Sequence, residues 1–537
     1  MGGEPTGIAR KLQESFRDFL HESATMFGEY GFLGDCERQL RELETGIVRP
    51  FNIAVFGRMK TGKSSLINAL LGRDLAITGV EETTATVNVI SYTTDGAMLG
   101  KFTIHWKDRP PETFPLDRLV ADWSGKTPEV VEKVAKTAYI QLYSDDPALA
   151  LHEIIDTPGT GAAVSDHEKV AQAFLDPSVQ EGRKADALVY VFGINGRETD
   201  EQNLATFRSG CLPGSKPYNS VGVLHKWDFT YWDSGGNWSE IQSKAERLKK
   251  QMSSVVAEVI PVSAPISTMA DRSSEEDLAA VLALIGAKGA KCIEQLLQDE
   301  EDWNEDDDCR VLSERFPFVP WPCFRIAVRE AVRLGESAAT DDFRARLGDL
   351  GGMDRLRSFL DRNFFKSAAL IRQRQQYARF LRVKDEAYAR IQDRQEELEE
   401  DTDNWDALVA ECHSSSSLAH WVGHKRDSAK AELKELVRRS VKLDNWLINN
   451  HIEDILNDLN ALDWCKSHPE RISGEELMAL RGMVDSLAGD AVATADENIL
   501  RVLEGRFASL QHGALDSNGR KAVEYLKGRI NSFLCMK

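Results

Sequence analysis

Two hydrophobic patterns divide the chain. Between about residues 50 and 290, short apolar runs such as 51–56 and 221–224 alternate with segments of helical spacing. This alternation is typical of a mostly parallel sheet flanked by helices. Before and after it, apolar residues recur at three-, four- and seven-residue steps, which predicts helices. We therefore expect an α/β domain joined to a large all-α, stalk-like helical domain.

The N-terminal residues predict two helices. One face of the first carries Ile8, Leu12, Phe16, Phe19 and Leu20, and one face of the second carries Cys36, Leu40 and Leu43. Such helices can pair, as a neck, with helices from the far end of the chain. Simple packing at the N-terminus is the open alternative.

The C-terminal part predicts longer helices. Residues 353–422 contain neither Gly nor Pro and keep helical apolar steps, which indicates a long helix packed in a bundle. A second stretch, 424–468, also lacks both residues, and 475–537 predicts shorter helices. A compact helical domain without a mechanical role is the alternative to a stalk. We expect three tryptophans in the core, with an exposed aromatic tip for lipid as the lesser alternative: Trp421, Trp446 and Trp464.

Changes in composition give the expected segment limits. We predict N-terminal helices at 1–48, the α/β domain at 49–295, an acidic and Pro-rich linker at 296–322 and the helical bundle at 323–537. Within the linker, the acidic run 299–308 is expected to be a solvated loop. Other local signals predict a capped helix after Ser274–Asp277 and an inserted hairpin at 101–106 followed by a helix at 128–136.

The most specific motif is the octamer Gly57–Ser64, which fits the phosphate-binding pattern G-x-x-x-x-G-K-[ST]. A strand-like run precedes it and helical spacing follows it, as a phosphate-binding loop requires. Backbone N–H groups, with contributions from Gly57, Gly62 and Ser65, would surround the phosphates at the positive end of the helix. Lys63 would reach the β- and γ-phosphates, and Ser64 would place its hydroxyl on Mg²⁺.

Two further segments carry the expected magnesium and γ-phosphate contacts. Asp156 follows an apolar run and can hold Mg²⁺ through water, while the N–H of Gly159 can approach the γ-phosphate. A threonine on a mobile loop should complete the Mg²⁺ shell. Thr84 is our candidate, and Thr83 is the alternative.

The segment His225-Lys226-Trp227-Asp228 distinguishes GTP from ATP. It follows an apolar run and fits the [NT]-K-x-D pattern of G proteins except at its first residue. The Asp228 carboxylate would accept two hydrogen bonds from the guanine edge, and the Lys226 stem would pack over the base. We expect guanine specificity with reduced affinity because His225 replaces the usual Asn or Thr. Ser263 and Ala264 resemble the last guanine-contacting loop, in which the Ala N–H meets the base oxygen.

Taken together, these motifs and the Thr83–Val87 run resemble the GTPase domain of bacterial dynamin-like proteins. The resemblance covers about residues 45–290, and the phrase Leu350–Leu356 also resembles the region after that domain. It implies GTP and GDP as ligands, Mg²⁺ as cofactor, GTP hydrolysis, and a nucleotide-dependent homodimer or higher assembly that moves a helical stalk. A role in membrane remodelling or vesicle secretion is the process that this family suggests.

The predicted site has two candidates for a catalytic cation. Lys60 stands where some dynamin relatives have an Arg and potassium-using G proteins an Asn, so its ammonium is our candidate for stabilising the leaving oxygens. Arg58 is the second candidate, and a solvated lysine that only attracts the nucleotide is the alternative for Lys60. Thr160 follows Gly159 where small G proteins have a water-positioning Gln, so Thr84 and backbone groups would orient water.

Composition restricts the partners. Lys and Arg number 66 and Asp and Glu 86, which gives a net charge of −20 and argues against nucleic-acid binding. The eight cysteines form no C-x-x-C pair, as expected in a reducing compartment. Without an apolar run long enough for a membrane span, we expect a cytoplasmic protein. Peripheral binding at the inner face of the membrane stays open.

Two other function classes remain as alternatives. One is a soluble Era-like regulatory GTPase acting on a ribosome or enzyme partner, although the potassium-site Asn and a basic RNA-binding domain are missing. The other is a GTP-bound scaffold with low turnover, which His225 and the missing Gln favour.

Overall fold

The computed structural model describes residues 7–46, 50–57, 60–76, 86–119, 127–150, 152–157, 185–193, 219–252, 256–335, 337–365, 368–411, 417–449, 457–458, 461–462, 464–465, 471–487, 495–509 and 517–536. The chain forms two compact units. The sheet unit comprises Pro50–Val179 and Arg183–Ile371 together with Met1–Gly3. The helical unit comprises Glu4–Arg49, Gln180–Gly182 and Arg372–Lys537.

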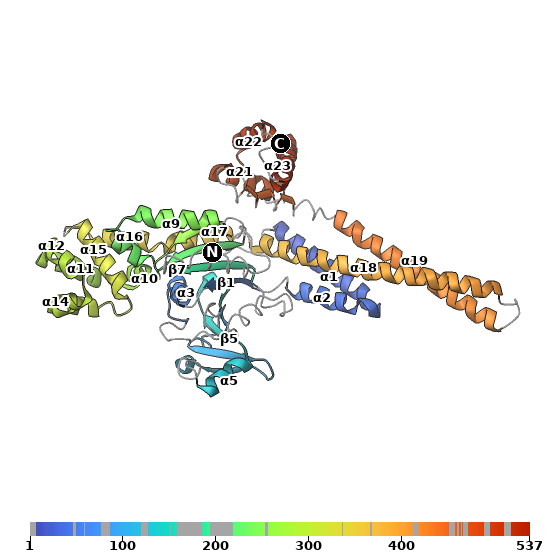
Figure 1. Ribbon diagram of the computed structural model, residues 1–537, viewed down its shortest axis with the longest axis horizontal. Coiled ribbons are helices and arrows are strands. Elements are labelled where there is room, and N and C mark those ends of the chain that lie inside the picture. The colour runs from blue at the N-terminus through green and yellow to red at the C-terminus, as the bar shows by residue number, and fades with distance from the viewer. Residues whose placement is uncertain are drawn as a thin grey trace. The chain divides into compact units, whose positions relative to one another are not determined.

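A nine-stranded sheet organises the sheet unit (Figure 1). Its strands are β1 (Phe51–Gly57), β2 (Asn88–Tyr92), β3 (Lys101–Trp106), β4 (Glu112–Pro115), β5 (Thr137–Ser144), β6 (His152–Asp156), β7 (Ala187–Gly193), β8 (Ser220–His225) and β9 (Val259–Pro261). Their order is β4-β3-β5-β2-β6-β1-β7-β8-β9. The run β6-β1-β7-β8-β9 is parallel throughout. The predicted mostly parallel sheet is confirmed.

Helices of the sheet unit cover both faces of the sheet. Along β1, Ala54 and Phe56 enter one apolar core while Ile53 and Val55 enter the other, as alternation on a fully covered strand requires. The helices are α3 (Lys63–Leu71), α5 (Pro128–Lys136), α8 (Asp228–Asp233), α9 (Trp238–Gln251), α10 (Ala264–Arg272), α11 (Glu275–Lys288), α12 (Ala290–Leu296), α13 (Glu300–Glu305), α14 (Asp307–Glu314), α15 (Trp321–Leu334), α16 (Thr340–Gly351) and α17 (Met353–Asn363), with a 3-10 turn at Pro147–Leu149.

Two local predictions are confirmed. Helix α11 begins with a capping box, in which the Ser274 side chain and the Asp277 side chain each pair with the other residue's backbone N–H. The inserted segment forms antiparallel β3 and β4 at the sheet edge, and α5 occupies the predicted residues.

The predicted linker at 296–322 is wrong. Its acidic residues cap two short helices, because Asp299 accepts the N–H of Glu301 at 2.8 Å and Asp306 accepts the N–H of Cys309 at 3.1 Å. Its buried apolar residues include Trp303 and Phe316, and Trp303 packs edge-on against Phe324 of α15 with ring centroids 5.6 Å apart. An acidic run therefore marks helix starts here and not a solvated loop.

The boundary at 295 is also too early. Helices α15, α16 and α17 belong to the sheet unit, which runs to Ile371. Their apolar faces close the cores of that unit, with buried Phe324, Phe343 and Leu347 on one side and Leu356 on the other. Periodicity predicts an apolar face, but it does not say which partner the face covers.

The helical unit contains α1 (Gly7–Gly28), η1 (Gly31–Leu33), α2 (Gly34–Gly46), α18 (Ala368–Glu411), which starts at its edge, α19 (Ser417–Asn449), α21 (Gly474–Leu487), α22 (Glu497–Ser509) and α23 (Ser517–Met536). Helices α1 and α2 bury their apolar faces against α18, where Phe19 meets Phe380 edge-on at 5.2 Å. The N-terminal helices therefore pair with the helix that follows the sheet unit, and a neck-like role for them stays a prediction. A separate apolar core joins α21, α22 and α23.

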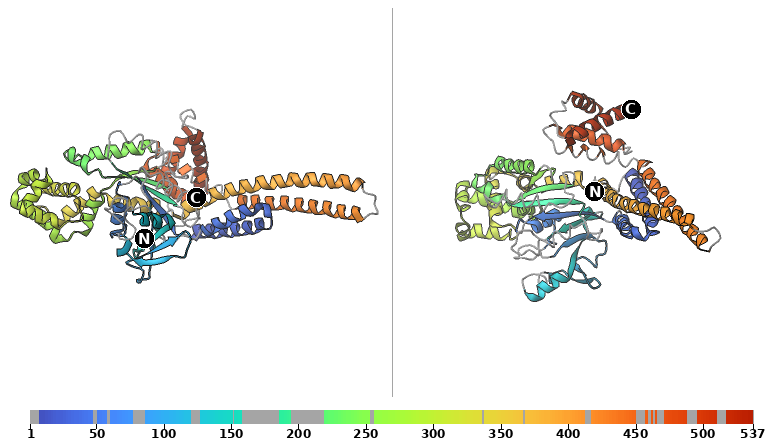
Figure 2. Two further views of the ribbon diagram at one scale, coloured as in Figure 1. Left: turned by 60° about the horizontal axis from the view of Figure 1, so that its bottom comes forward. Right: turned by 45° about the vertical axis from the view of Figure 1, so that its right-hand side comes forward.

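Helices α18 and α19 form an antiparallel hairpin (Figure 2). Ion pairs cross it between Arg394 and Glu432 at 3.3 Å and between Lys430 and Asp406 at 3.0 Å. Of the tryptophans expected in the core, Trp464 is buried, whereas Trp421 is 52% exposed and its prediction is wrong. Trp421 lies near the start of α19. The side chain of Trp446 lies outside the described residues.

Candidate functional site

The phosphate-binding loop joins β1 to α3. Gly62 has a φ of 92°, a left-handed conformation that glycine adopts without strain, and α3 begins at Lys63 directly after it. A Cβ on Gly57 would lie 2.6 Å from the backbone oxygen of Val191, so β7 leaves room only for glycine there. Lys63 is buried and donates from Nζ to the Gly57 carbonyl at 3.2 Å. Burial lowers the pKa of Lys63, and the nearby Asp156 opposes that shift.

Asp156 ends β6 beside the start of α3. Its Oδ2 accepts a hydrogen bond from Ser64 Oγ at 3.0 Å, while Oδ1 is buried without a hydrogen-bond partner. Burial raises the pKa of Asp156 to about 6, against the lowering effects of Lys63 and Ser64. A buried carboxylate oxygen without a partner, next to a hydroxyl, is a donor set that suits Mg²⁺. These two side chains therefore fit the predicted metal.

The base-side motif lies at the carboxyl end of β8. Lys226 has a φ of 57°, which is uncommon for a residue with a Cβ and typical of functional loops. Asp228 is buried at the first position of α8, and burial raises its pKa while Lys226 and Arg325 lower it. Trp227 is fully buried and packs edge-on against Tyr231 at 5.4 Å. The segment is thus a rigid helix start, not an ordinary surface turn.

His225 connects the loops. A Cβ on Gly62 would lie 2.6 Å from its Cε1, so the imidazole lies against the phosphate-binding loop. Its Nε2 accepts the backbone N–H of Ala264 at 3.3 Å. Burial lowers the pKa of His225 to about 4, so the ring is neutral and carries its proton on Nδ1. The imidazole therefore lies between the phosphate-binding loop and the loop that contains Ala264.

This contact changes the expectation for Ala264. Its N–H, predicted to meet the base oxygen, already has an acceptor in His225. A base oxygen would have to share or displace that acceptor. Ser263, the residue before it, donates its backbone N–H to the Gly351 carbonyl at 2.9 Å.

The described site residues meet at one edge of the sheet, because β1, β6, β8 and β9 are parallel and all end there. Gathered there are Gly57, Gly62, Lys63, Ser64, Ser65, Asp156, His225, Lys226, Asp228, Ser263 and Ala264. Lys60 lies in the phosphate-binding loop with an exposed side chain and a φ of 61°. Five candidates lie outside the described residues: Arg58, Thr83, Thr84, Gly159 and Thr160. Nucleotide binding by any of these residues stays a prediction.

Sequence reasoning missed three residues beside the base loops. Cys323 places its Sγ 3.7 Å from Ser263 Oγ, Arg325 acts electrostatically on Asp228, and Gly351 accepts from Ser263. All three belong to α15 and α16, which we had assigned to another domain. The Gly-Gly pair in the phrase Leu350–Leu356 was the one local signal that could have identified the turn.

The comparisons with known proteins agree with this geometry. Residues 53–210 match the sequence pattern described as the dynamin family. Dynamin-like protein 2 of Campylobacter jejuni is 31% identical over 159 residues, which are 30% of this chain and 23% of that protein. The isoniazid-induced protein IniC of Mycobacterium tuberculosis is 25% identical over 272 residues, 49% of this chain and 52% of that protein. The matches span about a quarter to a half of these relatives.

A solved structure of an oligomerised bacterial dynamin pair aligns with 97% of this chain and 86% of that chain. The identity is 15% and the TM-score 0.34, too low to support an argument. The family match, in contrast, runs from β1 past β7 and includes the phosphate-binding loop and Asp156. We conclude that residues 53–210 of this chain are similar to the dynamin family.

Proposed function

We propose that the protein binds GTP with Mg²⁺ and hydrolyses it to GDP and phosphate. The observation that carries the proposal is the meeting of two sets of groups at one sheet edge. One set, with Lys63 and the unpartnered Oδ1 of Asp156, suits a magnesium triphosphate. The other, with Lys226 and Asp228, suits a guanine base.

Each residue has a distinct proposed role. Lys63 binds the β- and γ-phosphates, and its buried position leaves its ammonium little solvent to displace. Ser64, Thr84 and Asp156 hold Mg²⁺, which supplies charge neutralisation at the phosphates when it is bound. The backbone N–H of Gly159 contacts the γ-phosphate. Asp228 accepts hydrogen bonds from guanine while Lys226 packs over the base.

Lys60 is the proposed transition-state cation, and Arg58 is the second candidate. The support for Lys60 is its position within the phosphate-binding loop, with its side chain exposed and not packed in the core. A cation held near the leaving oxygens stabilises the negative charge that develops during phosphoryl transfer.

We propose further that GTP-dependent dimerisation or higher assembly completes the site and that hydrolysis moves the helical unit. The pairing of α1 and α2 with α18 supports this, because it joins the segment before the sheet unit to the helix that follows it. The described part of the chain contains no helix with the length and hydrophobicity to cross a bilayer. The membrane contact that we propose is a peripheral one.

The hairpin of α18 and α19 supplies a specific observation for such a contact. Near its turn, Trp421 and Leu408 are 52% and 43% exposed, and Trp421 packs edge-on against Trp405 at 5.8 Å. Lys425 lies over the Trp421 ring at 5.7 Å. Exposed aromatics beside a cation suit the interface of an anionic bilayer.

The test measures GTP turnover per protomer over a wide protein concentration range, with and without anionic liposomes. We expect the rate to rise with concentration and to fall strongly in Lys60→Ala. Lys101→Ala removes an exposed lysine on β3, next to the edge strand β4, and this matched control should keep the wild-type rate. A Trp421→Ala variant should lose liposome binding but keep the rate in solution.

Other outcomes would favour the other classes. A slow rate that does not change with protein concentration, with liposomes or in Lys60→Ala would contradict the assembly mechanism. It would favour a switch with a protein partner. Tight GTP binding with negligible turnover would favour a scaffold.

A further inference from the structure

The turn between α16 and α17 touches the predicted guanine loop directly. The carbonyl of Gly351 accepts the backbone N–H of Ser263 at 2.9 Å. A Cβ on Gly351 would lie 2.3 Å from Ser267 Oγ and 2.9 Å from the Ser267 backbone nitrogen. Gly352 has a φ of 73°, and a Cβ there would lie 2.4 Å from the Pro261 carbonyl oxygen. Only two consecutive glycines allow the turn to come this close.

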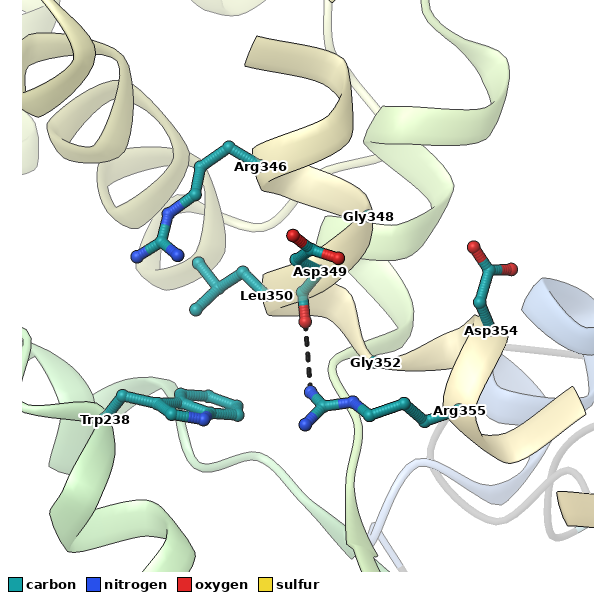
Figure 3. Close-up of a pocket in the computed structure, with 8 residues that line it drawn as sticks. All are labelled: Trp238, Arg346, Gly348, Asp349, Leu350, Gly352, Asp354 and Arg355. Atoms are coloured by element: carbon teal, nitrogen blue, oxygen red, sulfur yellow. Dashed lines mark hydrogen bonds between the residues drawn. The ribbon is translucent and has the colours of Figure 1, made fainter. Parts of the chain in front are cut away.

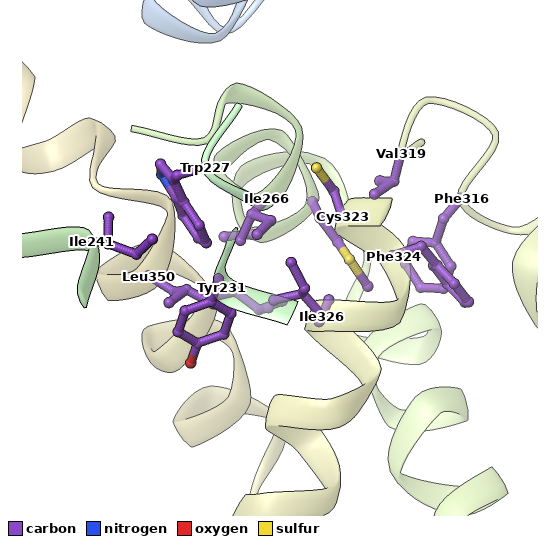
Figure 4. Close-up of a cluster of buried hydrophobic side chains, with 14 of the residues drawn as sticks. Trp227, Tyr231, Ile241, Ile266, Phe316, Val319, Cys323, Phe324, Ile326 and Leu350 are labelled. Atoms are coloured by element: carbon purple, nitrogen blue, oxygen red, sulfur yellow. The ribbon is translucent and has the colours of Figure 1, made fainter. Parts of the chain in front are cut away.

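Helix α15 supports the same loop from another side. Buried Cys323 places its Sγ 3.7 Å from Ser263 Oγ. Figure 4 shows Cys323 in one cluster with Ile266 of α10, Trp227 of the base motif and Leu350 of the turn. The two base loops and the helices that follow them therefore share one packed core.

A buried polar network adds a second link. Glu330 of α15 accepts the Tyr231 hydroxyl at 2.8 Å and two N–H groups of Arg346 at 2.8 and 2.7 Å. Tyr231 lies on α8, whose first residue is Asp228. Both halves of the proposed base site are thus attached to α15 and α16.

We propose that the turn Leu350–Met353 is a positioning element for the guanine base. Gly351 acts through Ser263, whose orientation sets that of the Ala264 N–H. This inference rests on the proposed binding of guanine nucleotide. Because coupling between two sites is reciprocal, a base bound at Ala264 also stabilises the turn, and the turn responds to whether the base is present.

On its other side, the turn Leu350–Met353 borders open space. A pocket of about 250 Å³ borders it, lined by residues of α9, α16 and α17 that include Trp238, Gly348 and Arg355 (Figure 3). Arg355 crosses the pocket floor and donates to the Asp349 carbonyl at 3.0 Å. A side chain added at Gly351, where the turn packs against Ser267, would therefore push the turn toward the pocket and leave the sheet intact.

The test compares Gly351→Ala with Gly348→Ala. A Cβ at Gly348 meets nothing within 4 Å, although this residue lies in the same helix one turn earlier. We measure the affinity of each full-length protein for Mg-GDP and Mg-ADP by calorimetry. Gly351→Ala should bind GDP at least about fivefold more weakly, as expected when one neutral hydrogen bond is lost, and its preference for GDP over ADP should fall equally. Gly348→Ala should match wild type in both.

Hydrogen exchange of the wild-type protein gives an independent result, should Gly351→Ala fail to fold. GDP should slow exchange of the Ser263 and Gly352 amides, and ADP at the same concentration should not. The inference would be overturned if a folded Gly351→Ala bound GDP with wild-type affinity. It would also be overturned if hydrogen exchange at the turn did not change when GDP was added. Absence of saturable GDP binding in the wild type would instead overturn the proposed function.

Discussion

At the scale of single residues, the site depends on two buried groups with altered protonation. His225 is neutral because burial lowers its pKa to about 4, and Asp156 is hard to ionise because burial raises its pKa to about 6. The first accepts the Ala264 N–H, and the second has an oxygen without a partner. In the proposed function, His225 would lose its partner and Asp156 would gain one when a magnesium nucleotide binds, so both should control affinity.

Replacement of His225 by Asn should tighten GDP binding. The shorter amide cannot reach Ala264 as the imidazole does, and the freed N–H becomes available to the base oxygen. We expect about a fivefold lower Kd, the effect of one neutral hydrogen bond, in a titration with fluorescent GDP.

His225→Ala is the control, since it also frees Ala264 but leaves a void against Gly62. It should be less stable than His225→Asn and show no comparable gain. Weaker GDP binding by His225→Asn would mean that the imidazole supports the base-bound state.

Binding of Mg-GDP should weaken as the pH falls below about 6. A protonated Asp156 cannot ligate Mg²⁺, whereas GDP binding in excess chelator should change little over that range. Asp156→Asn should remove the magnesium-dependent part of the GDP affinity at every pH. Equal pH profiles with and without magnesium would contradict this role.

The same group affects stability in a defined direction. The pKa of Asp156 is higher in the folded chain than the ordinary 3.8, so the folded state holds the proton more tightly. Its contribution to the free energy of unfolding of the nucleotide-free protein therefore falls as the pH rises from about 4 to about 6.

At the scale of elements, helices α15 and α16 hold the proposed guanine-binding segments in place. Glu330 is 1% exposed and joins α15 to α8 through Tyr231 and to α16 through Arg346. Arg333 adds a third contact at 2.7 Å. A carboxylate with this many partners fixes three helices relative to one another, and a surface ion pair would not.

Glu330→Gln should lower the free energy of unfolding of the sheet unit by about 3 kcal/mol, because one partner of a buried ionic network loses its charge. The comparison is Glu314→Gln, which removes the exposed pair with Arg310 on α14 and should cost less than about 1 kcal/mol. Urea unfolding followed by tryptophan fluorescence measures both. Equal small losses would show that the network contributes specificity without stability.

At the scale of the whole molecule, the chain returns on itself inside the helical unit. Helices α1 and α2 bury Phe16, Phe19 and Leu40 against α18, although more than 300 residues separate the two segments. This contact involves no residue of the proposed site. Stability of the helical unit and nucleotide affinity should therefore respond to different substitutions.

Phe380→Ala should destabilise the helical unit by about 3–5 kcal/mol, the usual cost of removing a buried aromatic ring. Calorimetry should show one thermal transition shifted downward while the Kd for Mg-GDP is unchanged. Leu408→Ala on the same helix removes a side chain that is 43% exposed and should leave the transition nearly in place. A change in the GDP affinity of Phe380→Ala would show that packing within the helical unit already acts on the nucleotide site in the GDP state.

Local signals determined much of this protein. The glycines and Lys63 of the phosphate-binding loop, the Ser274–Asp277 cap and the helix at 128–136 depend on short-range spacing, which the sequence states directly. The parallel sheet follows from alternating strands and helices, and it brings the ends of β1, β6 and β8 to one edge. Those of the expected site residues that the structure describes therefore lie at that edge.

Only the tertiary structure decided which faces meet. The acidic run at 299–308 became two capped helices because Trp303 had a core to enter, whereas Trp421 is exposed although the adjacent Val422 is buried. The contact of Gly351 with Ser263 joins residues 88 positions apart, and no local pattern encodes its partner. Sequence periodicity determines which residues share a face, whereas the partner of that face depends on packing between distant parts of the chain.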